Sequence, residues 1–274
     1  PTFLDEVAMG HHPTIPPHLS HLLYHKREAG VASGIVNAPD RSFNPQIDPY
    51  LPEEYGPRRH HTIKPKLKKD LQKRLLLKED PSVPILFWPS RLDPIQKGCS
   101  LLADILFQLI NDYNHLGLQI VMIADGPYQQ HFQGIVAHHG ISDRIAVQPF
   151  SESLSHLGYG GSDFVLMPSS FEPCGLPQMI GCRYGSLPIA HATGGLKDTV
   201  RHLNIHENTG NGFLFEHFTT DGFRWAIDQA MEFYQLSPDH KNPQIKRIME
   251  QSKEDFSDER VVADYQKIYN DLVN

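Results

Sequence analysis

The sequence lacks the marks of several large protein classes. Its 274 residues include only three cysteines, Cys99, Cys174 and Cys182, and this odd number without a CxxC pair argues against a disulfide framework or a zinc ribbon. No apolar run approaches the ~20 residues of a membrane-spanning helix, and residues 1–10 do not resemble a secretion signal. We therefore expect no membrane partner and a reducing location: the cytoplasm or, in a plant, the plastid stroma.

Excess positive charge and cofactor motifs are missing as well. The net charge of −7 provides no general attraction for nucleic acid, so no nucleic-acid partner is expected. Seventeen histidines are present without an HExxH or another ligand spacing, so we expect scattered surface histidines and no metal site. The GxGxxG and GxxxxGKS/T fingerprints are absent, which weighs against a nicotinamide dehydrogenase and a P-loop enzyme. We expect no cofactor.

A regular alternation begins at Pro84. Short apolar runs predict strands, and amphipathic stretches between them predict helices. The alternation is typical of an α/β fold, here a Rossmann-like parallel sheet of about six strands with helices on both faces. Ligands of such sheets bind outside the carboxyl ends of the strands, so the turns there are the candidate sites. The predicted strands are 85–88, 118–124, 145–147, 164–167, 187–190 and 212–215, and the predicted helices are 99–110, 128–139, 151–157, 175–184 and 219–236.

Residues 1–36 show little regular pattern. Pro13, Pro16 and Pro17 predict that no early helix forms, since proline removes a backbone donor and clashes with the preceding turn. Residues 18–27 could form one short helix.

The proline-rich stretch 37–52 reads as an irregular linker. We therefore place a domain edge near Val36. Residues 1–36 are expected to be the tail of a preceding domain and a linker, and residues 37–274 one domain that ends in a closing C-terminal helix. Because the chain begins without Met, we expect a fragment of a longer protein.

The segment 58–78 is strongly basic. It could be a patch for nucleic acid or glucan. The favoured interpretation is a solvated helix whose leucines at 67, 71 and 75 are buried on the opposite face.

The turn after the first strand holds two cations. Arg91 and Lys97 leave the end of a buried strand six residues apart, just before a helix begins. Helix starts attract anions, and arginine grips phosphate oxygens in a planar fork. This arrangement favours a phosphate or diphosphate site over a chance surface pair.

Two further turns carry an acid and glycines. Glu172 lies in a proline-stiffened turn before Gly175, where it could accept hydrogen bonds from sugar hydroxyls or support its own helix as a cap-like acid. Gly194 and Gly195 follow the fifth strand and could cradle a phosphate or form an ordinary flexible turn. This edge of the sheet thus combines two cations, an acid and helix starts that contain glycine. The combination favours binding of a sugar attached to a diphosphate.

At these residues the sequence resembles the glycogen and starch synthases, glucosyltransferases of the GT-B fold. The likeness runs from about residue 34 to the C-terminus and implies that the chain is the C-terminal half of that fold. The Glu-Pro-Cys-Gly-Leu and Thr-Gly-Gly-Leu segments at this spacing are its specific part. The matching segments are 90–92, 96–98, 171–176, 183–185, 193–196 and 198–200, with looser matches at 150–156 and 256–269.

The resemblance also implies roles for these residues. Arg91, Lys97 and Glu172 would be catalytic, the two cations on the donor diphosphate and the acid beside the donor sugar. Phe150 would pack near the nucleotide base, although a buried core position is an alternative. The other implied nucleotide-sugar contacts are Cys174, Gly175 and Leu176 for the sugar, and Thr193, Gly194 and Gly195 for the phosphates.

The implied reaction is a metal-free, retaining transfer of glucose from ADP-glucose or UDP-glucose to the 4-hydroxyl end of an α-1,4-glucan. The family's N-terminal domain, with its Lys-x-Gly-Gly-Leu loop, has no counterpart in this sequence. We therefore expect the chain alone to bind nucleotide but to transfer glucose negligibly. The alternatives are another GT-B enzyme with a different nucleotide sugar and a non-catalytic domain that binds glucan or a partner.

Overall fold

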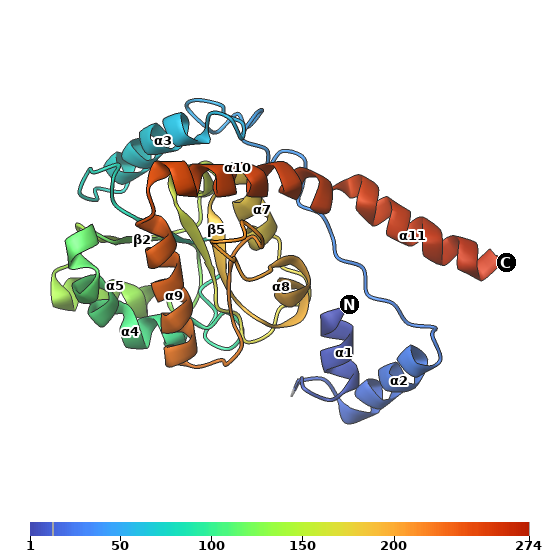
Figure 1. Ribbon diagram of the computed structural model, residues 1–274. Helices are drawn as coiled ribbons and strands as arrows, with labels where there is room; N and C mark the ends of the chain where they lie inside the picture. Colours follow the sequence, from blue (N-terminus) through green and yellow to red (C-terminus); the bar gives the residue numbers. More distant parts are fainter. Residues whose placement is uncertain (13, 274) are drawn as a thin grey trace.

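The computed structural model describes residues 1–12 and 14–273 (Figure 1). The helices are α1 (Thr2–Ala8), α2 (Pro17–Glu28), α3 (His60–Arg74), α4 (Cys99–Asp112), the 3-10 helix η1 (Asn114–Leu116), α5 (Gln129–His139), α6 (Glu152–Gly161), α7 (Pro177–Tyr184), α8 (Gly194–Thr199), α9 (Thr220–Tyr234), α10 (Pro238–Asp255) and α11 (Asp258–Val273). The strands are β1 (Ile85–Trp88), β2 (Gln119–Ile123), β3 (Ile145–Gln148), β4 (Phe164–Met167), β5 (Leu187–His191) and β6 (Phe213–Phe215).

Within the described residues, six strands form one sheet in the order β3-β2-β1-β4-β5-β6, and every neighbouring pair is parallel. This is the doubly wound order, in which the chain leaves β1 in one direction and returns beside it with β4. The predicted Rossmann-like sheet of about six strands is confirmed. Because β1, β4 and β5 are neighbours, the turns that follow them meet at one edge of the sheet.

Both faces of the sheet are buried, which explains why the strands read as continuous apolar runs. Side chains alternate between the faces along each strand. Leu86 and Trp88 of β1 pack into one core with α4, α5 and α9, whereas Ile85 and Phe87 pack into the other with α3, α6 and α7. The helices therefore cover both faces, as expected.

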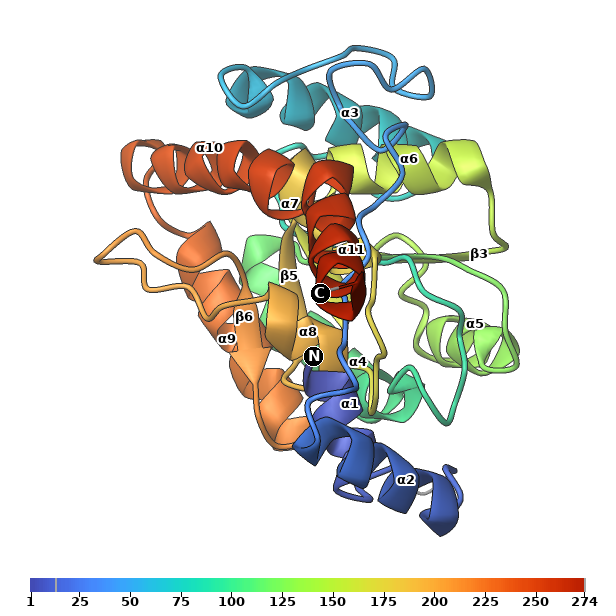
Figure 2. The ribbon, with the colours of Figure 1, turned by 90° about the vertical axis from the view of Figure 1, so that its right-hand side faces the viewer.

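Residues 1–36 are more helical than predicted (Figures 1 and 2). The prediction that no early helix forms is wrong, because α1 ends before the prolines at 16 and 17, while residue 13 lies outside the described residues. Pro17 stands at the first position of α2, where a missing N–H costs nothing. The N–H and hydroxyl of Thr2 donate to the Asp198 carboxylate on α8, the hydroxyl at 2.6 Å, and so dock α1 on the sheet domain.

Helix α3 differs from its prediction in one respect. Leu67, Leu71 and Leu75 are buried as expected, but Lys64 and Lys68 are buried with them. The Lys64 ammonium donates to the carbonyls of Tyr159, Gly160 and Tyr184 and to the Ser186 hydroxyl, at 2.9–3.3 Å. Most of these acceptors lie at the C-terminal ends of α6 and α7, where helix carbonyls attract a cation.

Helix α6 reaches Gly161 instead of ending near residue 157. Its last turn is built from glycines that pack against α3: a Cβ at Gly161 would lie 3.1 Å from the Leu67 carbonyl oxygen. The close contact between the two helices stabilises a segment whose glycines alone disfavour a helix. Among the described residues, no helix combines the length and apolar character needed to cross a membrane.

Candidate functional site

The turns after β1 and β4 interlock at the carboxyl edge of the sheet. Gly98 has a φ of +70°, and a Cβ there would lie 1.9 Å from the Pro168 carbonyl oxygen, so no other residue fits this approach. The Ser170 N–H donates to the Gln96 carbonyl at 2.8 Å, and its hydroxyl donates to the Ile95 carbonyl at 2.9 Å. The two turns therefore form one rigid unit, although more than 70 residues separate them in the chain.

This interlocking brings Lys97 and Glu172 together. The Lys97 ammonium lies 2.5 Å from the Glu172 carboxylate, and the Ser169 hydroxyl donates to the same oxygen at 3.1 Å. The two side chains keep only 12% and 9% of their surface exposed. Charge-assisted contacts of this length are strong, and the pair stays oriented because both members are hydrogen-bonded. A cation and a carboxylate thus share one end of the sheet.

Arg91 lies at the same rim with its side chain exposed. It forms no ion pair with any residue in 1–12 or 14–273. The neighbouring Asp93 carboxylate accepts the N–H groups of Gln96 and Ile95 at 2.8 and 2.9 Å, which shapes the turn. The pKa of Asp93 is lowered, first by the Gln96 N–H and also by the charges of Arg91 and Lys97. The charges of both cations thus favour the ionised form of this one carboxylate.

The turn before α8 already holds a carboxylate. The Thr193 hydroxyl donates to Glu6 of α1 at 3.1 Å, and the Gly194 N–H donates to the same carboxylate at 2.9 Å. The Gly195 N–H donates to the backbone carbonyl of Glu172 at 2.8 Å. Thr193 and Gly194, which were predicted to bind a phosphate, therefore bind the Glu6 carboxylate of the same chain. Gly195, the third residue predicted to bind phosphate, instead supports the turn that carries Glu172.

The remaining predicted residues surround this edge. Gly175 has a φ of +72°, and neither its N–H nor that of Leu176 donates to an acceptor within the described residues. Cys174 is half-buried, and burial raises the pKa of its thiol. Phe150 is 58% exposed, which rules out the core alternative, and its N–H donates to Asp125 at 3.1 Å.

Sequence reasoning missed three contributors: Ser169, Glu6 and His191. His191 ends β5, and its Nδ1 lies 2.8 Å from the Ser169 carbonyl oxygen. Burial lowers the pKa of His191, so the ring is neutral near pH 7. The position of His191 directly after a predicted strand could have indicated that it lies at the site, whereas nothing in the sequence around Glu6 indicated this. The expected surface placement of histidines is wrong for His191 and also for His12, His60 and His156, which are buried.

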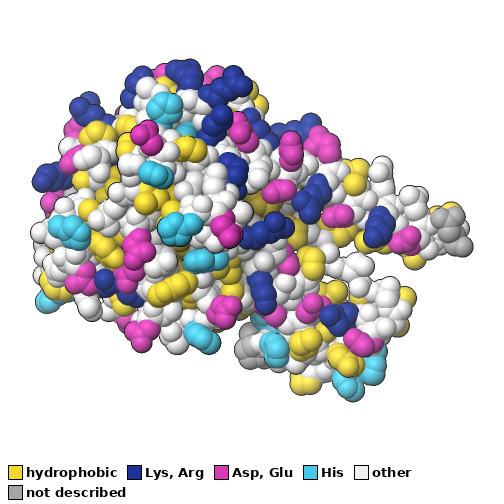
Figure 3. Space-filling model, viewed as in Figure 1, with side chains coloured by type: hydrophobic (Ala, Val, Ile, Leu, Met, Phe, Trp, Pro, Cys, Tyr) yellow, Lys and Arg dark blue, Asp and Glu magenta, His cyan; other side chains and the backbone are white. Residues whose placement is uncertain are grey.

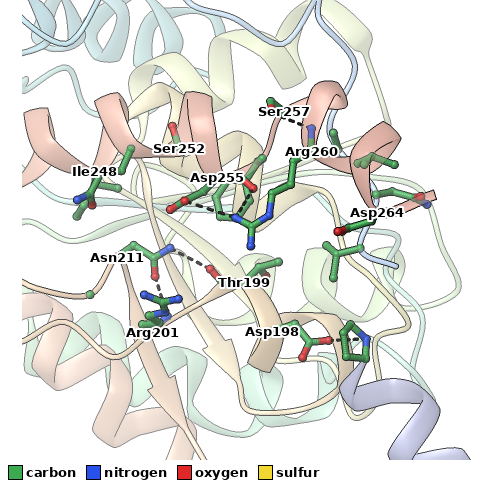
Figure 4. Close-up of a pocket in the computed structure, with 18 of the residues that line it drawn as sticks. Asp198, Thr199, Arg201, Asn211, Ile248, Ser252, Asp255, Ser257, Arg260 and Asp264 are labelled. Atoms are coloured by element: carbon green, nitrogen blue, oxygen red, sulfur yellow. Dashed lines mark hydrogen bonds and ion pairs between the residues drawn. The ribbon is translucent and has the colours of Figure 1, made fainter. Parts of the chain in front are cut away.

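A cavity of about 270 Å³ lies beside this edge, between α8 and the junction of α10 with α11 (Figure 4). Arg260 and Asp255 lie 3.6 Å apart in its wall at the helix junction, and Asn211 accepts the backbone N–H of Arg201 at 2.7 Å. Arg91, Lys97 and Glu172 do not line this cavity. In the part of the chain that the structure describes, no group of three or more His, Cys, Asp or Glu side chains is placed to hold a metal ion.

Comparisons with known proteins place this geometry in context. The profile of the family described as "Glycosyl transferases group 1" matches residues 68–246. The catalytic domain of starch synthase IV from Arabidopsis thaliana, solved with ADP and acarbose, superposes with a TM-score of 0.84 and 31% identity. That match covers 98% of this chain and 54% of the starch synthase chain. The predicted GT-B-like α/β fold is confirmed.

The curated relatives of this chain are also enzymes of the same kind, glycogen synthases. The chain is 34% identical to the glycogen synthase of Desulforamulus reducens, over 99% of this chain and 54% of that protein. It is 36% identical to the glycogen synthase of Exiguobacterium sibiricum, over 98% of this chain and 53% of that protein. The predicted resemblance to glycogen and starch synthases is confirmed, and the chain spans about half the length of these relatives.

Proposed function

Because this chain belongs to the group 1 glycosyl transferases, we propose that it is the nucleotide-sugar-binding half of a glycogen or starch synthase. The observation that carries the proposal is the Lys97–Glu172 pair, held at 2.5 Å on two interlocked turns at the edge where such sheets bind ligands. The similarity to glycogen synthases over nearly the whole chain supports the same activity.

Arg91 and Lys97 are assigned to the diphosphate of the donor. Arg91 is exposed and has no ion-pair partner among the described residues, so its guanidinium is available for two phosphate oxygens. Lys97 keeps one hydrogen-bonded partner and can direct its other N–H groups to the same anion. Two cations on the leaving nucleoside diphosphate would stabilise the charge that develops as the glucosyl bond breaks, without a metal ion.

Glu172 is assigned to the donor sugar. One of its carboxylate oxygens accepts from Lys97 and Ser169, which leaves the other for a sugar hydroxyl. The N–H groups of Gly175 and Leu176, which have no acceptor within the described residues, would bind further sugar oxygens. The implied reaction is retaining transfer of glucose to the 4-hydroxyl end of an α-1,4-glucan.

The second wall of the cleft is assigned to an N-terminal domain whose end is residues 1–36, with residues 37–274 as the donor domain. Helix α11 supports this: within the described residues it buries no side chain, and Val262, Tyr265 and Tyr269 are exposed on it. An amphipathic helix with an uncovered apolar stripe is expected to pack on a further domain. We expect negligible glucose transfer by this chain alone, since transfer requires both walls.

ADP-glucose is the proposed donor, because the starch synthase with the TM-score of 0.84 was solved with ADP. The test is calorimetric titration of this chain with ADP, UDP and ADP-glucose. Lys97→Ala should weaken ADP binding at least about tenfold, the effect of one lost charge-assisted contact. Lys69→Ala, an exposed lysine on α3, is the matched control and should change nothing.

Each alternative has its own signature in this titration. Preference for UDP would indicate a related enzyme with another nucleotide. Glucan binding without any nucleotide binding would indicate a non-catalytic domain. Equal effects of the Lys97 and Lys69 variants would refute the site assignment.

A further inference from the structure

Helix α1 packs against α8 beside the turns of the proposed donor site, although 187 positions separate Glu6 from Thr193 in the chain. The segment with α1 and α2 forms a lobe at the side of the sheet domain (Figures 1 and 3), and Figure 2 shows α1 directly below α8. This lobe therefore meets the sheet domain at the edge where the predicted site residues lie.

Glu6 of α1 caps α8 from outside that helix. Its carboxylate accepts the Gly194 N–H at 2.9 Å and the Thr193 hydroxyl at 3.1 Å. Thr193 stands at the N-cap position of α8, but its side chain makes no capping hydrogen bond to that helix. The first N–H groups of a helix have no partner inside it, so an acceptor there stabilises the turn. Glu6 supplies the acceptor that Thr193 does not provide.

The capped turn packs on the backbone of residues 171–176, called here the sugar turn because it carries Glu172. The Gly195 N–H donates to the Glu172 carbonyl at 2.8 Å. A Cβ at Gly194 would lie 2.0 Å from the same carbonyl oxygen, and a Cβ at Gly195 would lie 2.1 Å from the Cys174 carbonyl oxygen. Only glycine permits such a close approach. A shift of the turn before α8 would therefore move the backbone of Glu172.

A buried amide joins the same two segments a second time. The Gln178 Nε2 group donates to the Gly175 carbonyl at 2.8 Å and to the Thr199 hydroxyl of α8 at 3.0 Å. The Thr199 hydroxyl donates in turn to the Gly195 carbonyl at 2.6 Å. Because of these links, the sugar turn and α8 form one unit, and a contact that fixes α8 also fixes the sugar turn.

The residues after α1 also contact the sugar turn directly. The buried ring of His12 lies edge-on to the ring of Phe171, with the centroids 4.2 Å apart. Phe3 of α1 lies on His12, with the ring centroids 5.5 Å apart. Since Phe171 immediately precedes Glu172, the N-terminal segment supports the sugar turn at two points, through Phe171 and through α8.

The turn with the two cations is held differently. Its backbone contacts run from Gly98 to the Pro168 carbonyl and from Gln96 to Ser170. Among the described residues, no hydrogen bond joins residues 89–98 to residues 1–12. Loss of the Glu6 contact should therefore loosen the sugar turn and leave the cations in place.

We propose that Glu6 is a positioning residue of the donor site, which holds Glu172 against the donor sugar through the turn at residues 193–195. The proposal rests on the proposed function, in which Glu172 binds the sugar and Arg91 and Lys97 bind the diphosphate. Glu6 acts without touching the donor, since it fixes the turn that fixes the Glu172 backbone. The preference for ADP-glucose over ADP then depends on α1, whereas binding of the diphosphate does not.

The experiment is calorimetric titration of the full chain and its variants with ADP-glucose and with ADP. Glu6→Ala should weaken ADP-glucose binding about tenfold, the effect of a lost charge-assisted contact, and ADP binding less than about twofold. Asp5→Ala is the matched control on α1, because Asp5 pairs with Arg27 of α2 and not with the turn before α8. It should bind both nucleotides like the unchanged chain.

Two further variants separate positioning from other roles. Glu6→Gln keeps an acceptor oxygen for the turn, so its affinity for ADP-glucose should stay within about threefold of the unchanged chain. Thr193→Val removes the hydroxyl that donates to Glu6, and should weaken ADP-glucose binding about threefold with ADP binding unchanged. A loss of ADP affinity in Thr193→Val would show that residues 193–195 bind the phosphates, and would overturn the proposal.

Amide hydrogen exchange without nucleotide tests the contact independently of the donor. In Glu6→Ala, exchange at the Gly195 amide, which donates to Glu172, should become at least about tenfold faster, with α5 unchanged. Unchanged exchange at Gly195 would overturn the proposal, whether or not the chain binds nucleotide.

Two outcomes of the titration would also overturn it. Equal losses of ADP and ADP-glucose affinity in Glu6→Ala would indicate a general loss of structure instead of a displaced Glu172. If the unchanged chain binds neither nucleotide, the proposed function itself fails, and faster exchange at Gly195 would then mark Glu6 as a structural cap only.

Discussion

Replacement of Lys64 by methionine is expected to remove a pH dependence from the free energy of unfolding. Burial lowers the pKa of Lys64 from 10.5 to about 7, against a smaller raising effect of Asp163. Between these two values the unfolded chain binds more protons than the folded one, so stability rises with pH. Below pH 7 both states carry the proton, and this contribution no longer varies.

The magnitude follows from the two pKa values. From pH 7 to pH 9 the unfolded chain holds nearly one proton more on this group than the folded chain. At about 1.4 kcal/mol per pH unit, reduced near pH 7 where the folded state is half protonated, the gain is about 2 kcal/mol. Lys64→Met has no proton to release and should lack this gain.

Urea unfolding at pH 7, 8 and 9, followed by circular dichroism, measures this difference. Lys69→Met, a surface variant on the same helix, is the matched control and should keep the full gain. If the unfolding free energies of the chain and of Lys64→Met change in parallel with pH, the ammonium stays charged. Its three carbonyl acceptors would then outweigh the effect of burial.

Three further predictions concern other parts of the chain. Gly98→Ala should lower the free energy of unfolding by at least about 2 kcal/mol and weaken ADP binding, because the added Cβ would clash with the Pro168 carbonyl. The control is Gly134→Ala, at an open position on α5, which should raise the free energy of unfolding by about 0.5–1 kcal/mol. Urea unfolding measures both changes. The unfolding free energy should fall as pH drops from 6.5 to 4, because the unfolded chain protonates His60 first, and His60→Phe should reduce this loss. Glu6→Gln should weaken the docking of α1, seen as faster amide hydrogen exchange in that helix, with no change in α5 as the reference.

The sheet could be predicted because its information is local. Strands that are buried on both faces appear in the sequence as short apolar runs, whichever elements pack against them. The carboxyl ends of parallel strands lie at one edge of the sheet, and this rule predicted that the turns with Arg91, Lys97 and Glu172 lie at the same edge. The direct contact of Lys97 with Glu172 was not predictable, since it depends on how two turns 75 residues apart pack. Whether these residues act as proposed stays a prediction.

The misses share a physical cause: the stabilising partner lies far away in the sequence. Helix α1 has only seven residues and is docked through Thr2 to Asp198. The buried lysines of α3 find backbone carbonyls at the ends of other helices, and no residue type marks such acceptors in a sequence. Glu6 likewise gave no sign that it would reach Thr193.

The interlocking of the turns at Gly98 and Ser170 has a consequence for protein engineering. A graft of the first turn from an enzyme with another donor preference would have to bring the second turn with it. Otherwise the backbone contacts between them would be lost. Libraries that vary one turn alone should therefore yield mostly unstable clones, whereas paired libraries keep the scaffold intact while specificity changes.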